Sequence, residues 1–435
     1  MTANLSPRHL RTSVRRRPAG RVAAATAAAL LLGSRAAPPA VAATAAASPA
    51  ATAATQATTT GPRGKLLSVT PLRRWSRAEV AAFVSGNEVH ADPATMRYGA
   101  STYRLTYATV TPQGEPTTAS ALFVLPDGGP HHLSTVSVTH GTTLYRGNAP
   151  STGENVTLIG ALLYAAGGRA VVAPDYLGLG TGPGPHPYVD THSSVTASLD
   201  ALVASRKAAV RHGRHLTRDV YATGFSQGGQ VAMAVGRALQ RGAEPYFRLR
   251  ALAPISGPYD IAGAELPALF DGRIDDQSAV IYLAYFLTAQ NRLHPLWDDP
   301  REVFREGYAG KLTELFDSDH TPQEILPQLP GTVRELLTDE WYEKVRHPSG
   351  TLAAVIRRND GVCRWAPRVP VRLHTASGDR DVPIANARSC ARDLAARGVH
   401  AAVIDHGDVD HGGAYRASLP GIARWFARLG TPRHA

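Results

Sequence analysis

The chain has 435 residues, enough to bury one large hydrophobic core or two moderate ones. Its formal net charge is +11, but residues 1–42 hold seven arginines and no acidic residue, so the remainder carries only +4. No concentrated basic face with interleaved aromatic residues is visible in that remainder, which argues against nucleic-acid binding. The cysteines and histidines show no spacing typical of zinc ligands, which argues against a zinc site.

The amino terminus has the layout of a secretory signal peptide. An arginine-rich region precedes a short apolar run at residues 22–33, and residues 40–42 read Ala-Val-Ala, a small-residue cleavage site. The apolar run is too short to span a bilayer comfortably. We interpret residues 1–42 as the signal peptide of a secreted protein and residues 43–65 as an Ala/Thr-rich disordered leader. The pair Arg15-Arg16 leaves the twin-arginine export route open beside the general secretory (Sec) route.

Segments typical of strands and helices alternate through the first half of the remaining chain. This alternation predicts an α/β fold with a mostly parallel central sheet flanked by helices, and the first two strands indicate an antiparallel hairpin that opens the sheet. The predicted strands lie near residues 102–109, 118–125, 135–140, 169–174, 219–224 and 249–255, and the predicted helices near residues 154–166, 192–211 and 228–241.

A Gly-x-Ser-x-Gly pentapeptide at residues 224–228 joins the fifth of these strands to the helix that follows it. A serine at such a sharp turn holds its hydroxyl above the sheet, and the two glycines avoid the clashes that a Cβ would cause. The pattern predicts Ser226 as a catalytic nucleophile in a fold of the α/β-hydrolase type. In that fold an acid and then a histidine follow the serine along the chain. A coincidental turn is the alternative.

Catalysis by a serine also requires donors for the developing oxyanion. One donor in this type of fold is the backbone N–H of the residue after the nucleophile, here Gln227. The second comes from a loop after an early strand, and residues 140–143 read His-Gly-Thr-Thr directly after the strand at 134–139. We expect Thr142 to supply that amide, with Thr143 as the alternative, and we interpret the histidine of this loop as structural.

The alternation of strands and helices stops after residue 260. Residues 279–287 are strongly apolar, and residues 303–315 and 333–345 have the pattern of amphipathic helices. We therefore predict a helical cap over residues 261–346, inserted into a core formed by residues 66–260 and 347–432. The apolar side chains of the cap would cover the serine and line an acyl pocket, or would simply pack the cap onto the core.

Two aspartates compete for the role of the catalytic acid. The segment at residues 369–375 reads as a late strand, and Asp379 and Asp381 both follow it. A loop at the carboxyl end of a parallel strand is where sites of such folds form. We favour Asp379 because it lies four residues before Pro383, and Asp381 remains the alternative. The aspartate that is not the acid would be a solvated turn residue or a helix cap.

Two histidines compete for the role of the base. Residues 401–404 read as the last strand, and a final helix is predicted from about residue 415 to residue 429. His411 falls in the loop between them, whereas His406 directly follows the strand and has less freedom to reach across to a serine. We therefore expect His411 to be the base.

Cys363 and Cys390 are the only cysteines, and both lie in the part of the chain expected to be exported. In an oxidising compartment they are expected to form one disulfide that closes the loop around Asp379. On the loop-entropy model such a bridge stabilises the fold by about 3 kcal/mol. Two free buried thiols are the alternative.

The most specific motif is Asp-Tyr-Leu-Gly-Leu-Gly at residues 175–180, followed by His-Pro-Tyr at residues 186–188. Together with the serine motif and the Gly-Gly pair after His411, it resembles the secretory lipase family, which includes Candida antarctica lipase A. The similarity covers about residues 66–430. It implies an α/β-hydrolase fold with an inserted helical cap, Ser-Asp-His catalysis, no metal and no organic cofactor.

One loop departs from this family. In its lipase A member an acidic side chain helps to form the oxyanion hole, whereas the matching residues 140–143 of this chain resemble the His-Gly loop of esterases. The departure leaves the choice between a lipase and a short-chain esterase open.

These features predict a secreted serine hydrolase that cleaves carboxylic esters with an apolar acyl group. Its partner would be a small-molecule or lipid ester, with transient contact to a lipid interface through the cap and no obligate protein partner. Two other functions fit the same residues: a secreted serine peptidase or amidase, and a hydrolase fold that only binds.

Overall fold

The computed structural model describes residues 61–153 and 155–430. The predicted signal peptide and residues 43–60 of the predicted leader lie outside these residues. In the part that is described, no helix is both long and apolar enough to cross a membrane.

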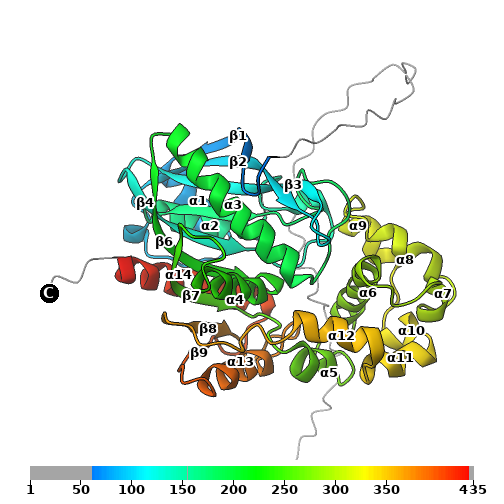
Figure 1. Ribbon diagram of the computed structural model, residues 1–435. Coiled ribbons are helices and arrows are strands. Elements are labelled where there is room, and N and C mark those ends of the chain that lie inside the picture. The colour runs from blue at the N-terminus through cyan, green and yellow to red at the C-terminus, as the bar shows by residue number, and fades with distance from the viewer. Residues whose placement is uncertain (1–60, 154, 431–435) are drawn as a thin grey trace, which may run out of the picture.

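A single nine-stranded sheet forms the centre of the protein (Figure 1). The strand order is β1-β2-β3-β5-β4-β6-β7-β8-β9, and the six strands from β5 to β9 in this order run parallel. Strands β1, β2 and β3 pair antiparallel, as do β3 and β5. The predicted α/β fold, with a mostly parallel sheet opened by an antiparallel hairpin, is confirmed. The strands are β1 (Leu66–Trp75), β2 (Gly99–Val110), β3 (Pro116–Asp127), β4 (His132–Thr139), β5 (Ala170–Pro174), β6 (His215–Phe225), β7 (Arg248–Ile255), β8 (Arg372–Thr375) and β9 (Ala402–Asp405).

The edge strand β1 has no counterpart among the predicted strands. Only its two terminal residues are buried, and most of the side chains between them are exposed. A strand with this exposure lacks the alternation of apolar and polar residues by which half-buried strands are recognised. Its pairing with β2 therefore depends on backbone hydrogen bonds, which do not require a particular pattern of residues.

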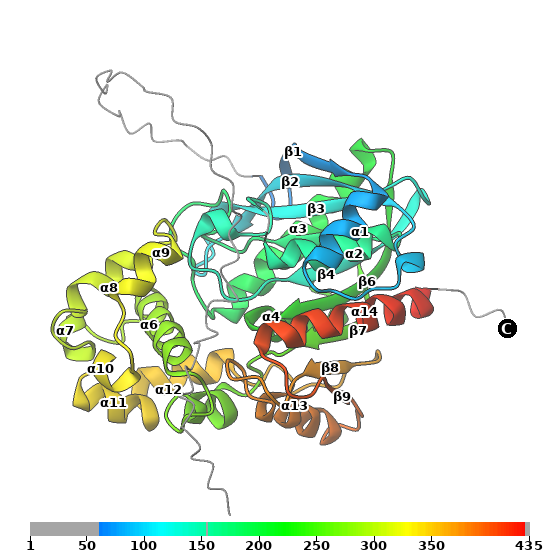
Figure 2. The same ribbon diagram turned by 180° about the vertical axis from the view of Figure 1, so that it is seen from behind.

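Helices cover both faces of the sheet (Figures 1 and 2). One apolar layer packs α1, α2 and α14 against the strands, and a second packs α3, α4 and α13 against the other face. The helices of the core are α1 (Arg77–Gly86), α2 (Val156–Ala166), α3 (Thr191–Arg211), α4 (Gln227–Gln240), α13 (Ala385–Ala395) and α14 (His411–Gly430), with short turns η2 (Pro93–Thr95) and η3 (Arg146–Asn148).

Helix α14 begins four residues earlier than predicted, so His411 is its first residue and does not stand in the preceding loop. The side chain of Asp410 accepts the backbone N–H of Gly413 at 2.6 Å, and its carbonyl oxygen accepts the N–H of Ala414 at 2.8 Å. These bonds satisfy backbone donors of the first turn, which would otherwise be unpaired. Glycine is a poor helix former, but this capping lets the two glycines after His411 continue the helix.

A group of helices, most of them short, forms a layer beside the sheet with an apolar cluster of its own (Figure 1). Within the predicted cap, residues 261–346, these are η4 (Ile261–Glu265), α5 (Leu266–Ala268), α6 (Asp276–Leu293), α7 (Pro300–Val303), α8 (Ala309–Leu315), α9 (Pro322–Ile325), η5 (Leu326–Gln328), α10 (Val333–Leu336) and α11 (Asp339–Arg346). Helix α12 (Gly350–Asn359) follows the cap in sequence and contributes Leu352, Val355 and Ile356 to the same apolar cluster. The boundary at residue 346 stays a prediction.

Two of the predicted cap helices are wrong as continuous elements. Residues 303–315 break between α7 and α8, and residues 333–345 break between α10 and α11. At the two breaks Phe304 and Leu337 are extended and form an antiparallel bridge. Here the backbone hydrogen bonds of two distant segments with each other replace those of a continuous helix. Periodicity within one segment does not report such pairing.

Cys363 and Cys390 form the expected disulfide, with their Cα atoms 5.3 Å apart. The bridge joins the segment after α12 to helix α13, and both cysteines are buried in the apolar layer that contains α3, α4 and α13. It encloses strand β8 and the loop that carries Asp379 and Asp381.

Candidate active site

Ser226 occupies the turn between the end of β6 and the start of α4. Its backbone has φ 59° and ψ −127°, a conformation that non-glycine residues adopt only when their surroundings enforce it. A Cβ at Gly224 or Gly228 would collide with Thr139 or its backbone, so the neighbouring strand β4 leaves no room for a side chain at either position. The turn therefore projects the serine hydroxyl away from the sheet.

Asp379 and His411 lie together beside this turn. The Nδ1 atom of His411 is 2.8 Å from Oδ2 of Asp379, and both side chains are buried. The other carboxylate oxygen of Asp379 accepts the backbone N–H groups of Asp381, at 3.0 Å, and Val382, at 2.9 Å. These three bonds hold the carboxylate with one oxygen facing the imidazole.

Asp379 and His411 each stabilise the charged form of the other. Burial by itself would raise the pKa of Asp379, but the neighbouring imidazole and the hydrogen bonds lower it below its usual range. Burial would lower the pKa of His411, but the charge of Asp379 and the bond to it raise that pKa to about 9. An ionised aspartate thus stabilises the protonated form of the histidine, as the orienting acid of a general base must do.

The Nε2 atom of His411 is buried and has no hydrogen-bond partner among the described residues. The ring of Phe225, the residue before Ser226, packs against the imidazole with the ring centroids 4.4 Å apart. Because Nδ1 is bonded to Asp379, Nε2 is the nitrogen available to accept a proton from a hydroxyl. Such a bond is often long before substrate binds and shortens during the reaction.

The rival residues have other partners. Asp381 accepts hydrogen bonds from the hydroxyls of Ser278, at 2.6 Å, and Tyr282, at 2.9 Å, both on α6. The Nε2 atom of His406 lies 3.1 Å from Nδ1 of His374 and 3.0 Å from the hydroxyl of Ser418 on α14. Asp381 therefore connects the β8–α13 loop to the cap, whereas His406 packs between β8 and α14.

The two predicted oxyanion residues line the same cavity as Ser226. Gln227 is the first residue of α4, and the first N–H groups of a helix have no partner within it. Thr142 lines the cavity, whereas the hydroxyl of Thr143 points back to the carbonyl oxygen of Gly141 at 3.1 Å. A Cβ at Gly141 would lie 3.2 Å from Cβ of Ser226, which shows how closely this loop approaches the serine.

The side chains of both oxyanion residues are held by the loop that carries the Asp-Tyr…His-Pro-Tyr motif. The hydroxyls of Thr142 and Tyr188 are 2.8 Å apart. The Nδ1 atom of His186 is 2.9 Å from the carbonyl oxygen of Leu177, and its Nε2 atom is 3.4 Å from the side-chain amide nitrogen of Gln227. Burial lowers the pKa of His186 to about 3, so its neutral ring can accept from the amide.

The first half of the motif supports the loop at residues 140–143 from beneath. The buried carboxyl of Asp175 accepts bonds from the hydroxyl of Ser120, at 2.5 Å, and from the hydroxyl and N–H of Ser151, at 2.5 and 2.8 Å. Its carbonyl oxygen lies 3.0 Å from Nε2 of His140, whose carbonyl oxygen accepts the hydroxyl of Tyr176. In the sequence analysis this motif indicates only a resemblance to a family, and no role is predicted for its residues.

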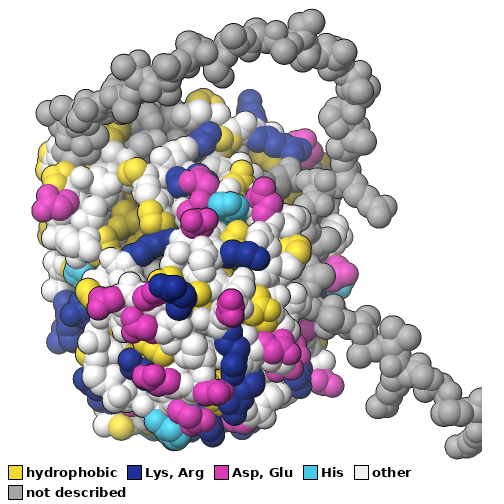
Figure 3. Space-filling view, turned by 90° about the vertical axis from the view of Figure 1, so that its right-hand side faces the viewer, with side chains coloured by type: hydrophobic (Ala, Val, Ile, Leu, Met, Phe, Trp, Pro, Cys, Tyr) yellow, Lys and Arg dark blue, Asp and Glu magenta, His cyan; other side chains and the backbone are white. Residues whose placement is uncertain are grey.

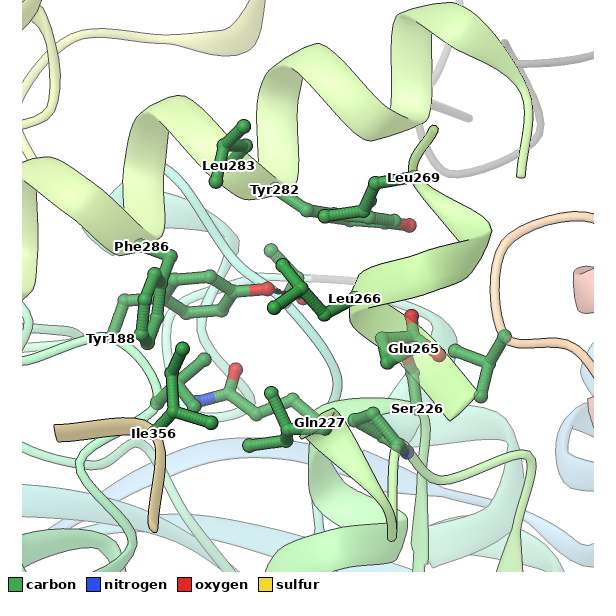
Figure 4. A pocket seen from close by; sticks show the side chains of 15 residues that line it. Tyr188, Ser226, Gln227, Glu265, Leu266, Leu269, Tyr282, Leu283, Phe286 and Ile356 are labelled. Carbon is green, nitrogen blue, oxygen red and sulfur yellow. Dashed lines mark hydrogen bonds between the residues drawn. The ribbon is translucent and has the colours of Figure 1, made fainter. Parts of the chain in front are cut away.

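A cavity of about 700 Å³, including its open mouth, lies between the cap and the core above Ser226 (Figure 4). Its lining is mostly apolar and combines residues of the cap with residues of the core. Those drawn and labelled in Figure 4 are Tyr188, Ser226, Gln227, Glu265, Leu266, Leu269, Tyr282, Leu283, Phe286 and Ile356. A concave apolar site with a few polar groups at one end is the usual form of a small-molecule site.

Asp379, Asp381 and His411 are the described residues whose side-chain ligand atoms could surround a metal ion, with all of those atoms within 4.8 Å of one another. The hydrogen bonds given above already involve Nδ1 of His411, both carboxylate oxygens of Asp379 and Oδ1 of Asp381. The arrangement is therefore explained without a cation.

No protein-family model matches the sequence, and a search of the curated proteins found no match. Solved structures do match. A candidate hydrolase from Legionella pneumophila has a TM-score of 0.77 at 24% identity, over 85% of this chain and all of that one. Candida antarctica lipase A in its closed state has a TM-score of 0.58 at 14% identity, over 80% of this chain and 78% of the lipase.

The chain has the α/β-hydrolase fold. This α/β-hydrolase is also similar to LipA of Xanthomonas oryzae, an esterase that degrades the rice cell wall, with a TM-score of 0.73 at 26% identity over 85% of this chain and 99% of LipA. The predicted lipase-like resemblance is thereby confirmed at the level of the fold. A further structure of LipA, with a bound ligand, also matches at 26% identity, whereas the similarity to lipase A, at 14% identity, concerns the fold alone.

Proposed function

We propose that this α/β-hydrolase is a secreted serine esterase or lipase that cleaves carboxylic esters with an apolar acyl group. The observation that carries the proposal is the buried His411–Asp379 pair, 2.8 Å apart, beside a serine held in a strained turn. A serine hydroxyl is a weak nucleophile unless an oriented base removes its proton. The free Nε2 atom of His411 is the base that this geometry offers.

In the proposed reaction Ser226 attacks the ester carbonyl while His411 takes its proton. Asp379 stabilises the resulting imidazolium, and the backbone N–H groups of Gln227 and Thr142 bind the oxyanion. His411 then gives the proton to the leaving alcohol, which leaves the acyl group on Ser226. Water, activated by the same histidine, releases the acid and restores the hydroxyl.

Secretion rests on the predicted signal peptide and is supported by the disulfide, since such bridges persist in oxidising compartments. The face of the cap in Figure 3 carries interspersed acidic and basic side chains with scattered apolar ones. Such a mixed face suits transient contact with a lipid surface better than stable insertion.

A series of p-nitrophenyl esters from acetyl to palmitoyl tests the proposed function. Burying one CH2 group contributes about 0.8 kcal/mol, which corresponds to about fourfold in binding. We therefore expect kcat/KM to rise from acetyl through the short acyl chains and to fall once the chain exceeds the cavity. Activity that continues to rise to palmitoyl would identify a true lipase. Hydrolysis of none of the esters would contradict the proposal.

Replacing Tyr188 by phenylalanine tests the support of the oxyanion loop. The change removes the hydroxyl that contacts Thr142 at 2.8 Å but keeps the ring stacked on Tyr285, with centroids 4.2 Å apart. One hydrogen bond contributes roughly 0.5–1.5 kcal/mol, so we expect kcat to fall by about 2- to 10-fold. KM should change little, because the oxyanion exists only in the transition state.

Tyr246→Phe is the matched control, since the hydroxyl of Tyr246 bonds the carbonyl oxygen of Leu216 at 2.6 Å and Tyr246 does not line the cavity. Its kcat should equal that of the wild type. A Tyr188→Phe variant with a changed KM and an unchanged kcat would mean that the hydroxyl binds substrate and does not position the loop.

A further inference from the structure

One residue of the cavity lining carries a carboxylic acid. Glu265 is the last residue of η4, where the chain leaves the core and enters the cap. Figure 4 shows its side chain within the cavity, close to Ser226. The residue is partly buried, and the lining also includes the apolar side chains of Ile261 and Leu266. A polar group in such surroundings is costly to bury without a partner.

Asn386 on α13 holds one oxygen of this carboxyl. The side-chain amide of Asn386 donates to Oε2 of Glu265 at 2.6 Å, while its Oδ1 atom accepts the backbone N–H of Asp260 at 3.1 Å. The second bond fixes which end of the amide faces Glu265. Within the described chain, no hydrogen bond reaches Oε1 of Glu265, so this oxygen remains for a group that enters the cavity.

Burial raises the pKa of Glu265 to about 8. The charges of Asp379 and Asp381 raise it further, whereas Asn386 and His411 act in the opposite direction. At neutral pH the side chain is therefore mostly a neutral acid, which can both donate and accept a hydrogen bond. A substrate hydroxyl is the complementary group, since it too donates and accepts.

The position of Glu265 indicates which part of an ester it would meet. Asn386, which holds its carboxyl, also donates to the carbonyl oxygen of Pro383 at 3.3 Å. Pro383 belongs to the loop that carries Asp379, the hydrogen-bond partner of His411. In the proposed reaction His411 gives its proton to the oxygen of the leaving alcohol, so the alcohol must lie on the histidine side of the serine. Glu265 is on that side.

We propose that Glu265 forms a subsite for the alcohol portion of the ester and selects alcohols that carry a further free hydroxyl, such as partially esterified polyols. The inference rests on the proposed serine esterase function. The apolar remainder of the cavity would then take the acyl portion. Glu265 acts here on specificity and takes no part in proton transfer.

The test compares two esters that differ by one group. In 2-hydroxyethyl butyrate a hydroxyl replaces the terminal methyl of n-propyl butyrate, so size and acyl group are matched. For the wild type we expect kcat/KM to be about 2- to 10-fold higher for the hydroxyethyl ester, the contribution of one hydrogen bond. Glu265→Leu should bring the ratio to about one, and Glu265→Gln, which can still donate and accept, should restore most of it.

Glu314→Leu is the matched control, because Glu314 is an exposed acid on α8 that does not line the cavity. Its ratio should equal that of the wild type. A ratio that stays unchanged in Glu265→Leu, with both esters slowed equally, would assign Glu265 a purely structural role and overturn the inference alone. If the wild type cleaves neither ester, the proposed function fails together with the inference.

A second measurement needs no variant. The acyl-enzyme formed from p-nitrophenyl butyrate can be offered equal concentrations of ethane-1,2-diol and 1-propanol. Each alcohol gives its hydroxyl proton to His411 and takes the butyryl group from Ser226, which regains its own proton. We expect the hydroxyethyl ester to exceed the propyl ester by about the same 2- to 10-fold, after correction for the two hydroxyls of the diol. Equal yields would overturn the inference.

Discussion

Replacement of Ser226 by alanine is expected to lower kcat on p-nitrophenyl esters by roughly four to six orders of magnitude. Alanine removes the nucleophile and leaves the oxyanion donors and the cavity in place, so only the weak catalysis by those parts remains. The fold should survive, because the strained backbone at φ 59° is imposed by Gly224, Gly228 and the neighbouring strands and not by the hydroxyl. Circular dichroism and the thermal midpoint should therefore match the wild type.

Ser256 provides a matched control for this experiment. It follows β7 as Ser226 follows β6, its φ is also positive at 43°, and it is buried. Its hydroxyl has no hydrogen-bond partner among the described residues, and it does not line the cavity. Ser256→Ala should retain full activity. Near wild-type turnover by Ser226→Ala would contradict the serine mechanism, and labelling of the wild type by an active-site phosphonate should be lost in Ser226→Ala alone.

Replacement of Asp379 by asparagine is expected to lower kcat by roughly four orders of magnitude. The variant keeps the size of the side chain but loses the charge that stabilises the protonated form of His411. An asparagine whose amide nitrogen faces Nδ1 would also hold the imidazole in the wrong tautomer. Substrate binding should change little, because Asp379 is buried and does not line the cavity.

Asp381→Asn separates the two aspartates that the sequence left as alternatives. The Oδ1 atom of Asp381 accepts hydroxyls from Ser278 and Tyr282, and its side chain makes no hydrogen bond to His411. Its replacement should lower the thermal midpoint more than it lowers kcat. A large loss of kcat in Asp381→Asn, with full activity in Asp379→Asn, would reverse the assignment.

The pH dependence gives a second readout of the same pair. The base acts when it is neutral, and in the wild type Asp379 raises the pKa of His411 to about 9 against the effect of burial. We therefore expect kcat/KM to rise with pH through a limb well above 6.5, the ordinary pKa of histidine. In Asp379→Asn burial remains while the raising charge is lost, so the limb of the residual activity should move to lower pH. If the rise of kcat/KM occurs at the same pH in both proteins, it reflects the titration of a group other than His411.

The local features of the fold were visible in the sequence because each depends on residues that are close together in the chain. The strand, the Gly-x-Ser-x-Gly turn and the helix after it lie within residues 215–240, and the turn requires its glycines for steric reasons that any chain would share. The alternation of strands and helices predicted the parallel sheet in the same way. The disulfide followed from two cysteines and the expected compartment.

Features that depend on contacts between distant segments were predicted less well from the sequence. The exposed edge strand β1 and the break at Phe304 and Leu337 depend on backbone hydrogen bonds between distant segments. Every residue type can take part in such bonds, with proline lacking only the N–H donor, so they leave no periodicity to detect. The start of α14 at His411 depended on a cap by Asp410 that outweighed two glycines.

The sequence by itself determined the fold class, the serine turn and a short set of candidate acids and bases, because these follow from spacing and steric demands along the chain. Only the tertiary structure decided which candidates lie together, since Asp379 and His411 are 32 residues apart and meet through the adjacent strands β8 and β9. It also decided the surroundings of the site: the Tyr188–Thr142 contact, the cavity beneath the cap and the carboxyl of Glu265 within it. These are contacts between segments that sequence separation places far apart, and packing alone brings them into reach.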